Sequence, residues 1–172
     1  YVVCPSNPTL AGNIAANLSL KVPNSALIGA SGDSRAALDL GIPSTRLIEI
    51  DWRFPLSNAP IRHNGVTVWP IDPMKYIDEI GNVHALVDSI KSKFNLTIID
   101  CAGSFKFCTR IANDESVLLV AKEADMDAVT SHWHRNFGRR HATLISPTDT
   151  PDLMEVENGF IITCFTAGDE IT

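Results

Sequence analysis

Short apolar runs recur along the chain, and several are apolar at nearly every position instead of alternating with polar residues. This pattern is typical of strands that are covered on both faces. Eight runs are predicted to form strands: YVVC (1–4), SALIGA (25–30), RLIEI (46–50), VTVWPI (66–71), LTIIDCA (96–102), SVLLVA (116–121), ATLIS (142–146) and GFIITCF (159–165).

Between these runs, apolar residues recur at helical spacing. Leu10, Ile14 and Leu18 repeat every four residues and form one buried stripe of a helix. Four segments are predicted to be helical: 10–21 after an N-cap at Thr9, 33–40 before Gly41, 73–94, and 125–137 before Gly138. The segment 54–64, rich in proline and asparagine, is predicted to be the longest loop.

The alternation of strands and helices predicts an α/β fold. Crossovers of this kind build a mostly parallel, doubly wound sheet with helices on both faces, in three layers α/β/α. Ligands of such sheets bind outside the carboxyl ends of the strands.

Length and charge narrow the classes of function. The chain has 172 residues, of which 45 % are hydrophobic, so we expect a single domain over 1–172 with a sizeable core. A net charge of −6 argues against a surface that generally coats nucleic acid, because phosphate-binding faces are rich in lysine and arginine. Any anion site must therefore be local.

The cellular compartment is predicted from the absence of membrane-spanning and signal-peptide patterns in the sequence. No stretch reaches the roughly 18 consecutive apolar residues that span a bilayer, and no signal-peptide pattern opens the chain. We expect a cytoplasmic protein without membrane insertion, in which the cysteines at 4, 101, 108 and 164 are reduced. Tyr1 lies inside a predicted strand and is not preceded by a methionine, which suggests a domain excised from a longer protein.

The stretch CPSNPTLAGNIAANL (4–18) has the order strand, loop, helix of a phosphate-binding loop. It resembles the opening of the ParA/MinD family of ATPases, in which a proline, a glycine-rich loop with two lysines, two threonines and an IAANL-type helix follow one another. The likeness continues in SALIGAS (25–31), VTVWPIDP (66–73), LTIIDCAG (96–103) and SVLLVAKEADMDAVTSHWHR (116–135). The resemblance implies a P-loop NTPase-like fold.

The loop residues depart from the family pattern. Superposing the IAANL segments assigns four family positions: the intermolecular lysine to Ser6, the phosphate-gripping lysine to Ala11, the magnesium-ligating hydroxyl to Gly12 and the following threonine to Asn13. Asn7, Pro8 and Thr9 complete the loop, and Pro8 lacks a backbone N–H where the family has a glycine that faces phosphate. All four assigned positions are altered.

The metal and water positions are altered as well. The two aspartates that the family uses on its second strand fall on Gly29 and Ser31, whereas Asp100 keeps the family's identity. Asp100 also has a structural interpretation, in which it caps the loop after its strand.

Phosphoryl transfer depends on charge placed around the β and γ phosphates. We therefore predict no catalytic residue, no metal and no bound cofactor, and lean against an enzyme. The resemblance implies a non-hydrolysing positioning or assembly scaffold that acts through a protein partner or as a homodimer. Plasmid partition, division-site placement and the pilus-assembly branch, whose members often carry eroded loops, are the contexts it suggests.

Two alternatives remain open. The first is an ATPase or sensor that binds ATP and magnesium through backbone donors at 9–13, with Arg35 or a partner's arginine as the cation. The second is a nucleic-acid-binding adaptor that uses the basic edge of SHWHRNFGRRHA (131–142), formed by Arg135, Arg139, Arg140 and His141. The same residues could instead neutralise the carboxyl end of a helix.

Overall fold

The central strands form where the sequence is apolar at successive positions. In the computed structural model, all four residues of β2 (Ser25–Ile28) and of β4 (Val66–Trp69) are buried, as expected for strands between two layers of helices. The structure describes residues 2–3, 8–29, 35–47, 60–70, 80–111, 117–120, 123–137, 142–147, 153–156, 159–162 and 165–171.

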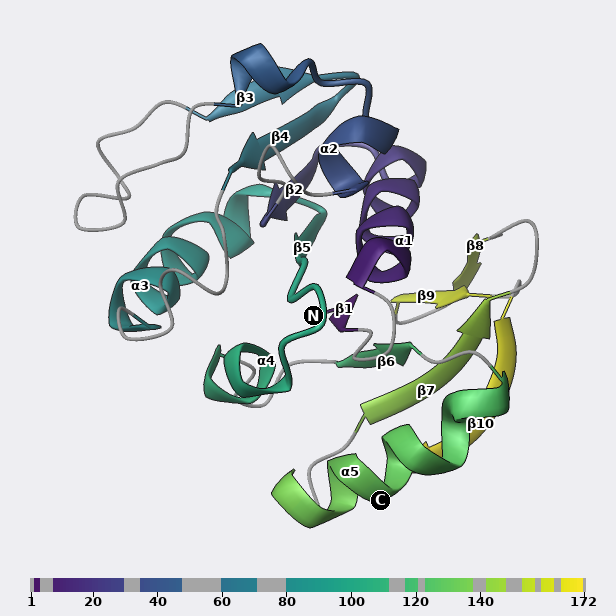
Figure 1. The fold of residues 1–172 in the computed structure, drawn as a ribbon. Coiled ribbons are helices and arrows are strands. Elements are labelled where there is room, and N and C mark those ends of the chain that lie inside the picture. The colour runs from purple at the N-terminus through teal and green to yellow at the C-terminus, as the bar shows by residue number, and fades with distance from the viewer. Residues whose placement is uncertain are drawn as a thin grey trace.

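Two four-stranded sheets carry the fold (Figure 1). The first has the order β3-β4-β2-β5, in which β2 runs parallel to β4 and to β5 (Leu96–Ile99), and β3 (Ile61–His63) is antiparallel to β4. The second has the order β1-β6-β7-β10. Its strands β1 (Val2–Val3), β6 (Leu118–Val120) and β7 (Ala142–Pro147) are parallel, and β10 (Phe165–Ile171) is antiparallel to β7. The mostly parallel α/β architecture is confirmed.

The antiparallel elements were not predicted. The segment 54–64, predicted as a loop, contains β3, because the Asn64–Gly65 turn folds it back on β4. The run 159–165 is not one strand: β9 (Gly159–Ile162) pairs with β8 (Leu153–Val156), and β10 begins at Phe165. The strand predicted over 46–50 is wrong at its start, since Ser44–Arg46 is a 3-10 turn; residues 48–50 lie outside the described residues.

The helices follow the predicted spacing, except that one begins earlier than predicted and one was not predicted. Helix α1 (Pro8–Lys21) begins before the predicted N-cap Thr9, because Pro8 occupies the first turn, where its missing N–H costs no hydrogen bond. Helices α2 (Arg35–Asp39), α3 (Ile80–Ile90) and α5 (Met126–Phe137) match predicted segments, whereas α4 (Phe105–Ile111) was missed. Gly138, the predicted end of α5, and residues 73–79 lie outside the described ranges.

Helix α2 ends at the predicted glycine. The N–H of Gly41 donates to the carbonyl of Leu38 at 2.9 Å, and the N–H of Ile42 donates to that of Ala37 at 3.0 Å. These two bonds form a Schellman motif, which satisfies carbonyls at the carboxyl end of the helix.

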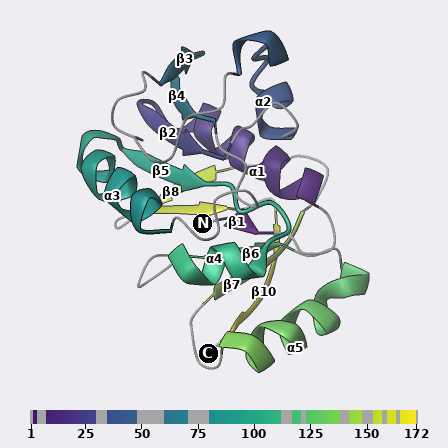
Figure 2. The same cartoon turned by 60° about the vertical axis from the view of Figure 1, so that its left-hand side comes forward.

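Helices lie on both sides of the first sheet (Figures 1 and 2). Helices α1 and α2 pack against each other on one side, and α3 lies on the opposite side. Helix α1 contacts β1 as well as β2 and β5, so one helix packs on strands of both sheets. Buried side chains of α1, α2, β2, β4 and β5 form one core cluster, which includes Ile14, Leu27, Leu40 and Val68. None of the described helices is long and apolar enough to cross a bilayer.

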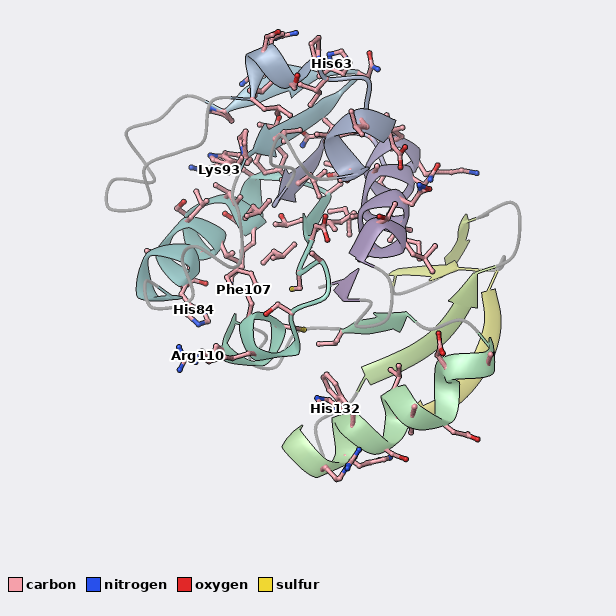
Figure 3. The ribbon with its side chains drawn as sticks, viewed as in Figure 1. His63, His84, Lys93, Phe107, Arg110 and His132 are labelled. Atoms are coloured by element: carbon pink, nitrogen blue, oxygen red, sulfur yellow. The ribbon has the colours of Figure 1, made fainter. Side chains whose placement is uncertain are left out.

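Helix α4 is held at both ends. Its N-cap is Ser104, whose Oγ accepts the N–H of Phe107 at 3.1 Å. At its other end, His84 of α3 donates from Nε2 to the carbonyl of Arg110 at 3.2 Å (Figure 3). Phe107 and Cys108 of this helix are fully buried.

We expect Ser104→Ala to lower the free energy of unfolding by about 1 kcal/mol, because the helix loses its capping acceptor. Ser104→Asp retains an acceptor oxygen and should stay close to the wild type. Urea denaturation measures both; equal losses for the two variants would contradict a capping role.

Candidate functional site

The described part of the candidate site lies at the carboxyl ends of β2, β4 and β5. These strands are parallel and in register, with Ile28 opposite both Trp69 and Ile99. Gly29 and Asp100 follow directly and therefore occupy the edge where sheets of this kind bind ligands.

Gly29 is held in close contact with the backbone of Asp100. Its N–H donates to the carbonyl of Trp69 at 3.1 Å, and the N–H of Asp100 donates to the carbonyl of Ile28 at 2.9 Å. At φ +106°, a Cβ on Gly29 would lie 2.5 Å from the backbone oxygen of Asp100. The position to which the resemblance assigns a family aspartate therefore has no room for a side chain in this backbone.

Asp100 is used within the fold. Its side chain is 2 % exposed, and its Oδ1 accepts the N–H of Ala102 at 2.8 Å. Ala102 has φ +47°, an uncommon value for a residue with a side chain, and this hydrogen bond helps to hold that turn. The geometry is that of the predicted structural role, in which Asp100 caps the loop after β5.

Two buried thiols lie beside this turn. Cys101 and Cys108 are free and fully buried, and Cys101 directly follows Asp100. Burial raises the pKa of the Cys101 thiol well above its usual value, and the neighbouring Cys108 raises it further. The protonated thiol is a weak nucleophile, so Cys101 is unsuited to covalent catalysis at neutral pH.

The start of α1 is packed into the core. Ala11 is 0 % exposed and belongs to the same core cluster as Ala36 and Ala37 of α2. Gly12 is also buried, Asn13 is half-buried and Thr9 is exposed. Gly12 and Asn13 lie in the second turn, where helix geometry directs their N–H groups to the carbonyls of Pro8 and Thr9.

The remaining predicted positions are only partly described. Six lie outside the described residues: Ser6, Asn7, Ser31, Arg139, Arg140 and His141. Arg35 opens α2, and its backbone alone is described. Arg135 is exposed and donates from Nε to the carbonyl of Ser131, one turn earlier in α5, at 3.1 Å.

Helix α5 has one buried face. Trp133 is 1 % exposed, whereas His132 and His134 are exposed. Within the described ranges, no three histidine, cysteine or acidic residues lie close enough together to hold a metal ion.

The described residues do not fit magnesium and a triphosphate at this edge. The position assigned to the phosphate-gripping lysine is a core alanine, and the position assigned to an aspartate lies against a carbonyl oxygen. The carboxylate of Asp100 is engaged with a backbone N–H of its own turn. Sequence reasoning missed Trp69 and Ala102 as partners in this arrangement; both contribute backbone atoms, which leave no signal in side-chain identity.

Comparison with known proteins identifies the fold. No family model matches the chain, and no curated protein matches its sequence. Among solved structures, a chain of the MinC:MinD cell division protein complex of Aquifex aeolicus has a TM-score of 0.52 at 19 % identity, over 81 % of this chain and 62 % of that one. A variant of Cyanothece McdA in complex with ATP has a TM-score of 0.54 at 12 % identity, over 81 % of this chain and 64 % of that one.

A third similar structure is the cobyrinic acid a,c-diamide synthase of Mycobacterium smegmatis with a bound ATP analog and magnesium. Its TM-score is 0.51 at 14 % identity, over 83 % of this chain and 71 % of that one. The fold is therefore that of the ParA/MinD-like P-loop ATPases, as expected from the sequence. Likeness at these identities establishes the fold alone.

We expect Gly29→Ala to lower the free energy of unfolding by about 2–4 kcal/mol, because the added Cβ combines backbone strain with a clash against Asp100. The matched control is Gly81→Ala on the exposed start of α3, where a Cβ meets nothing within 4 Å. It should stabilise by roughly 0.5–1 kcal/mol. Similar shifts for both variants in urea denaturation would contradict the close approach at Gly29.

We expect Ala11→Lys to destabilise the protein by roughly 3 kcal/mol or more, since it overfills a packed core and buries an ammonium group. Leu20→Lys, at an exposed position of the same helix, should change stability by about 0.5 kcal/mol or less. A stable Ala11→Lys variant that gains affinity for ATP would mean that position 11 faces a ligand.

Proposed function

We propose that this domain is a ParA/MinD-like scaffold that does not hydrolyse ATP and acts through protein–protein contacts. The single observation that carries the proposal is the burial of Ala11 in the core between α1 and α2, at the position assigned to the phosphate-gripping lysine. Without that cation, the charge that develops in phosphoryl transfer is not stabilised.

The environment of Gly29 and Asp100 supports the proposal. Restoring an aspartate at Gly29 would place its Cβ against the Asp100 carbonyl, so regaining this group requires a change in the backbone of two strands. The backbone around Gly29 therefore leaves no room for the carboxylate that the resemblance assigns to this position, and one substitution does not restore it.

The kind of scaffold is inferred by analogy. One protein of similar fold belongs to a two-protein cell division complex, which supports a role in contacting a protein partner or a second copy of the chain. The eroded loop favours a context such as the pilus-assembly branch of the family. The chain spans 62 % of the length of its counterpart in that complex, so other segments of a longer protein can contribute to the contact.

A thermal-shift titration with ATP and magnesium tests the proposal. A ligand present at 100 times its Kd stabilises the folded state by about 2.7 kcal/mol, which raises the Tm of a domain of this size by roughly 5–10 °C. We expect no shift for this chain. A ParA/MinD ATPase with intact loop lysines provides the positive control.

The contrary result would support the alternative of an ATP sensor. In that case, the rise in Tm should disappear in Asp100→Asn, a variant that keeps an oxygen acceptor for the N–H of Ala102 and removes the charge. An elution volume that changes on adding ATP would also contradict nucleotide-independent assembly.

A further inference from the structure

The turn between β3 and β4 consists of two exposed residues, Asn64 and Gly65. His63 pairs with Val66, so these two residues alone connect the strands. Both have positive φ, 48° at Asn64 and 80° at Gly65, as in the type I′ turns that suit β-hairpins. The paired residues of β3 and β4 do not include Asn64 or Gly65, so the N–H groups of these two residues take no part in the strand pairing.

This turn lies against the carboxyl end of α2. The Nδ2 of Asn64 donates to the carbonyl of Leu40 at 3.4 Å, a long hydrogen bond. The Nε2 of His63 would lie 3.6 Å from a Cβ placed on Gly41, and Figure 3 shows His63 at this end of the molecule. The hairpin tip therefore packs on the Schellman motif that ends α2.

We propose that Asn64 is a site of spontaneous deamidation, and that the product weakens the contact between the hairpin and α2. The backbone nitrogen of Gly65, after losing its proton, attacks Cγ of Asn64. The Nδ2 group takes up a proton and leaves as ammonia, and a five-membered succinimide forms. One water molecule then opens the ring at either carbonyl and gives aspartate or isoaspartate.

The surroundings of the turn permit this reaction. Gly65 has no side chain to hinder the approach of its nitrogen to Cγ, and no atom lies within 4 Å of the place where a Cβ would be. Asn64 and Gly65 are both exposed, so water reaches the ring. The hydrogen bond from Nδ2 to Leu40 is at the limit of length and restrains the amide weakly.

The product changes the electrostatics of the contact. The carbonyl of Leu40 belongs to the carboxyl end of α2, which carries partial negative charge. A carboxylate at position 64 removes the amide donor and places a negative charge beside that carbonyl. Because the lost hydrogen bond is long, the added negative charge beside the carboxyl end of α2 is the main cause of the weaker contact.

A second asparagine provides an internal control. Asn24 has the same left-handed backbone, with φ 55°, but is followed by Ser25, a buried residue of β2. Its Nδ2 donates to the carbonyl of Lys93 at 3.1 Å, and its carbonyl accepts the N–H of Asn95 at 3.0 Å. The backbone nitrogen of Ser25 is fixed by the sheet, so Asn24 should keep its amide.

The test is peptide mapping of the folded chain during long incubation at neutral pH and 37 °C. We expect the peptide with Asn64 to gain the mass of an amide-to-acid exchange, and to become a substrate for isoaspartyl methylation, while the peptide with Asn24 stays unchanged. The mapping must separate the peptide with Asn64 from the peptide with Asn158, which also precedes a glycine. Asn158 lies outside the described residues. An unchanged Asn64, or equal conversion of Asn64 and Asn24, would overturn the proposal.

Two variants separate the chemistry from its consequence. Asn64→Gln keeps an amide but disfavours the five-membered ring, so the modification at 64 should be lost. Asn64→Asp carries one product from the start and tolerates the positive φ of this turn as asparagine does, so we expect its Tm to lie below that of the wild type. A Tm for Asn64→Asp equal to that of the wild type would overturn the claimed effect on the hairpin contact.

Discussion

The close approach of β2 and β5, between Gly29 and the backbone of Asp100, is the constraint on which the site depends. Two backbone hydrogen bonds, from Gly29 to Trp69 and from Asp100 to Ile28, join the ends of the three strands. The space that a side chain at position 29 would need is filled by the Asp100 carbonyl. The ends of three neighbouring strands are thus fixed by main-chain contacts. The side chain of Asp100 also holds the turn after β5, through its hydrogen bond to Ala102.

The start of α1 is likewise occupied by internal packing at a position where the resemblance implies a ligand contact. The resemblance to the ParA/MinD ATPases assigns a lysine to position 11; here the alanine belongs to the core that joins α1 to α2. Internal contacts fill the space around both positions, so we expect a polar side chain at either one to conflict with the fold. Under the proposed function, selection for a stable scaffold replaces selection for charge around a triphosphate.

The sequence predicted the parallel elements well, since continuous apolar runs such as SALI and helical spacing in α1 depend on local pattern. Strand β3 was missed because it is three residues long and because Asn64, the first residue of its turn, was assigned to the predicted loop 54–64. In the candidate site, the residue types alone showed which charged residues of the family pattern are replaced in this chain. They did not show the burial of Ala11 or the close approach at Gly29, because these depend on contacts between segments distant in sequence.

Steady-state release of inorganic phosphate from ATP, measured on the purified domain over a range of protein concentrations, tests the central claim most directly. The account predicts a rate that does not rise with the amount of domain, with magnesium present and at saturating ATP. A rate proportional to domain concentration, retained through further purification and lost in Asp100→Asn, would contradict the claim that this strand edge no longer supports phosphoryl transfer.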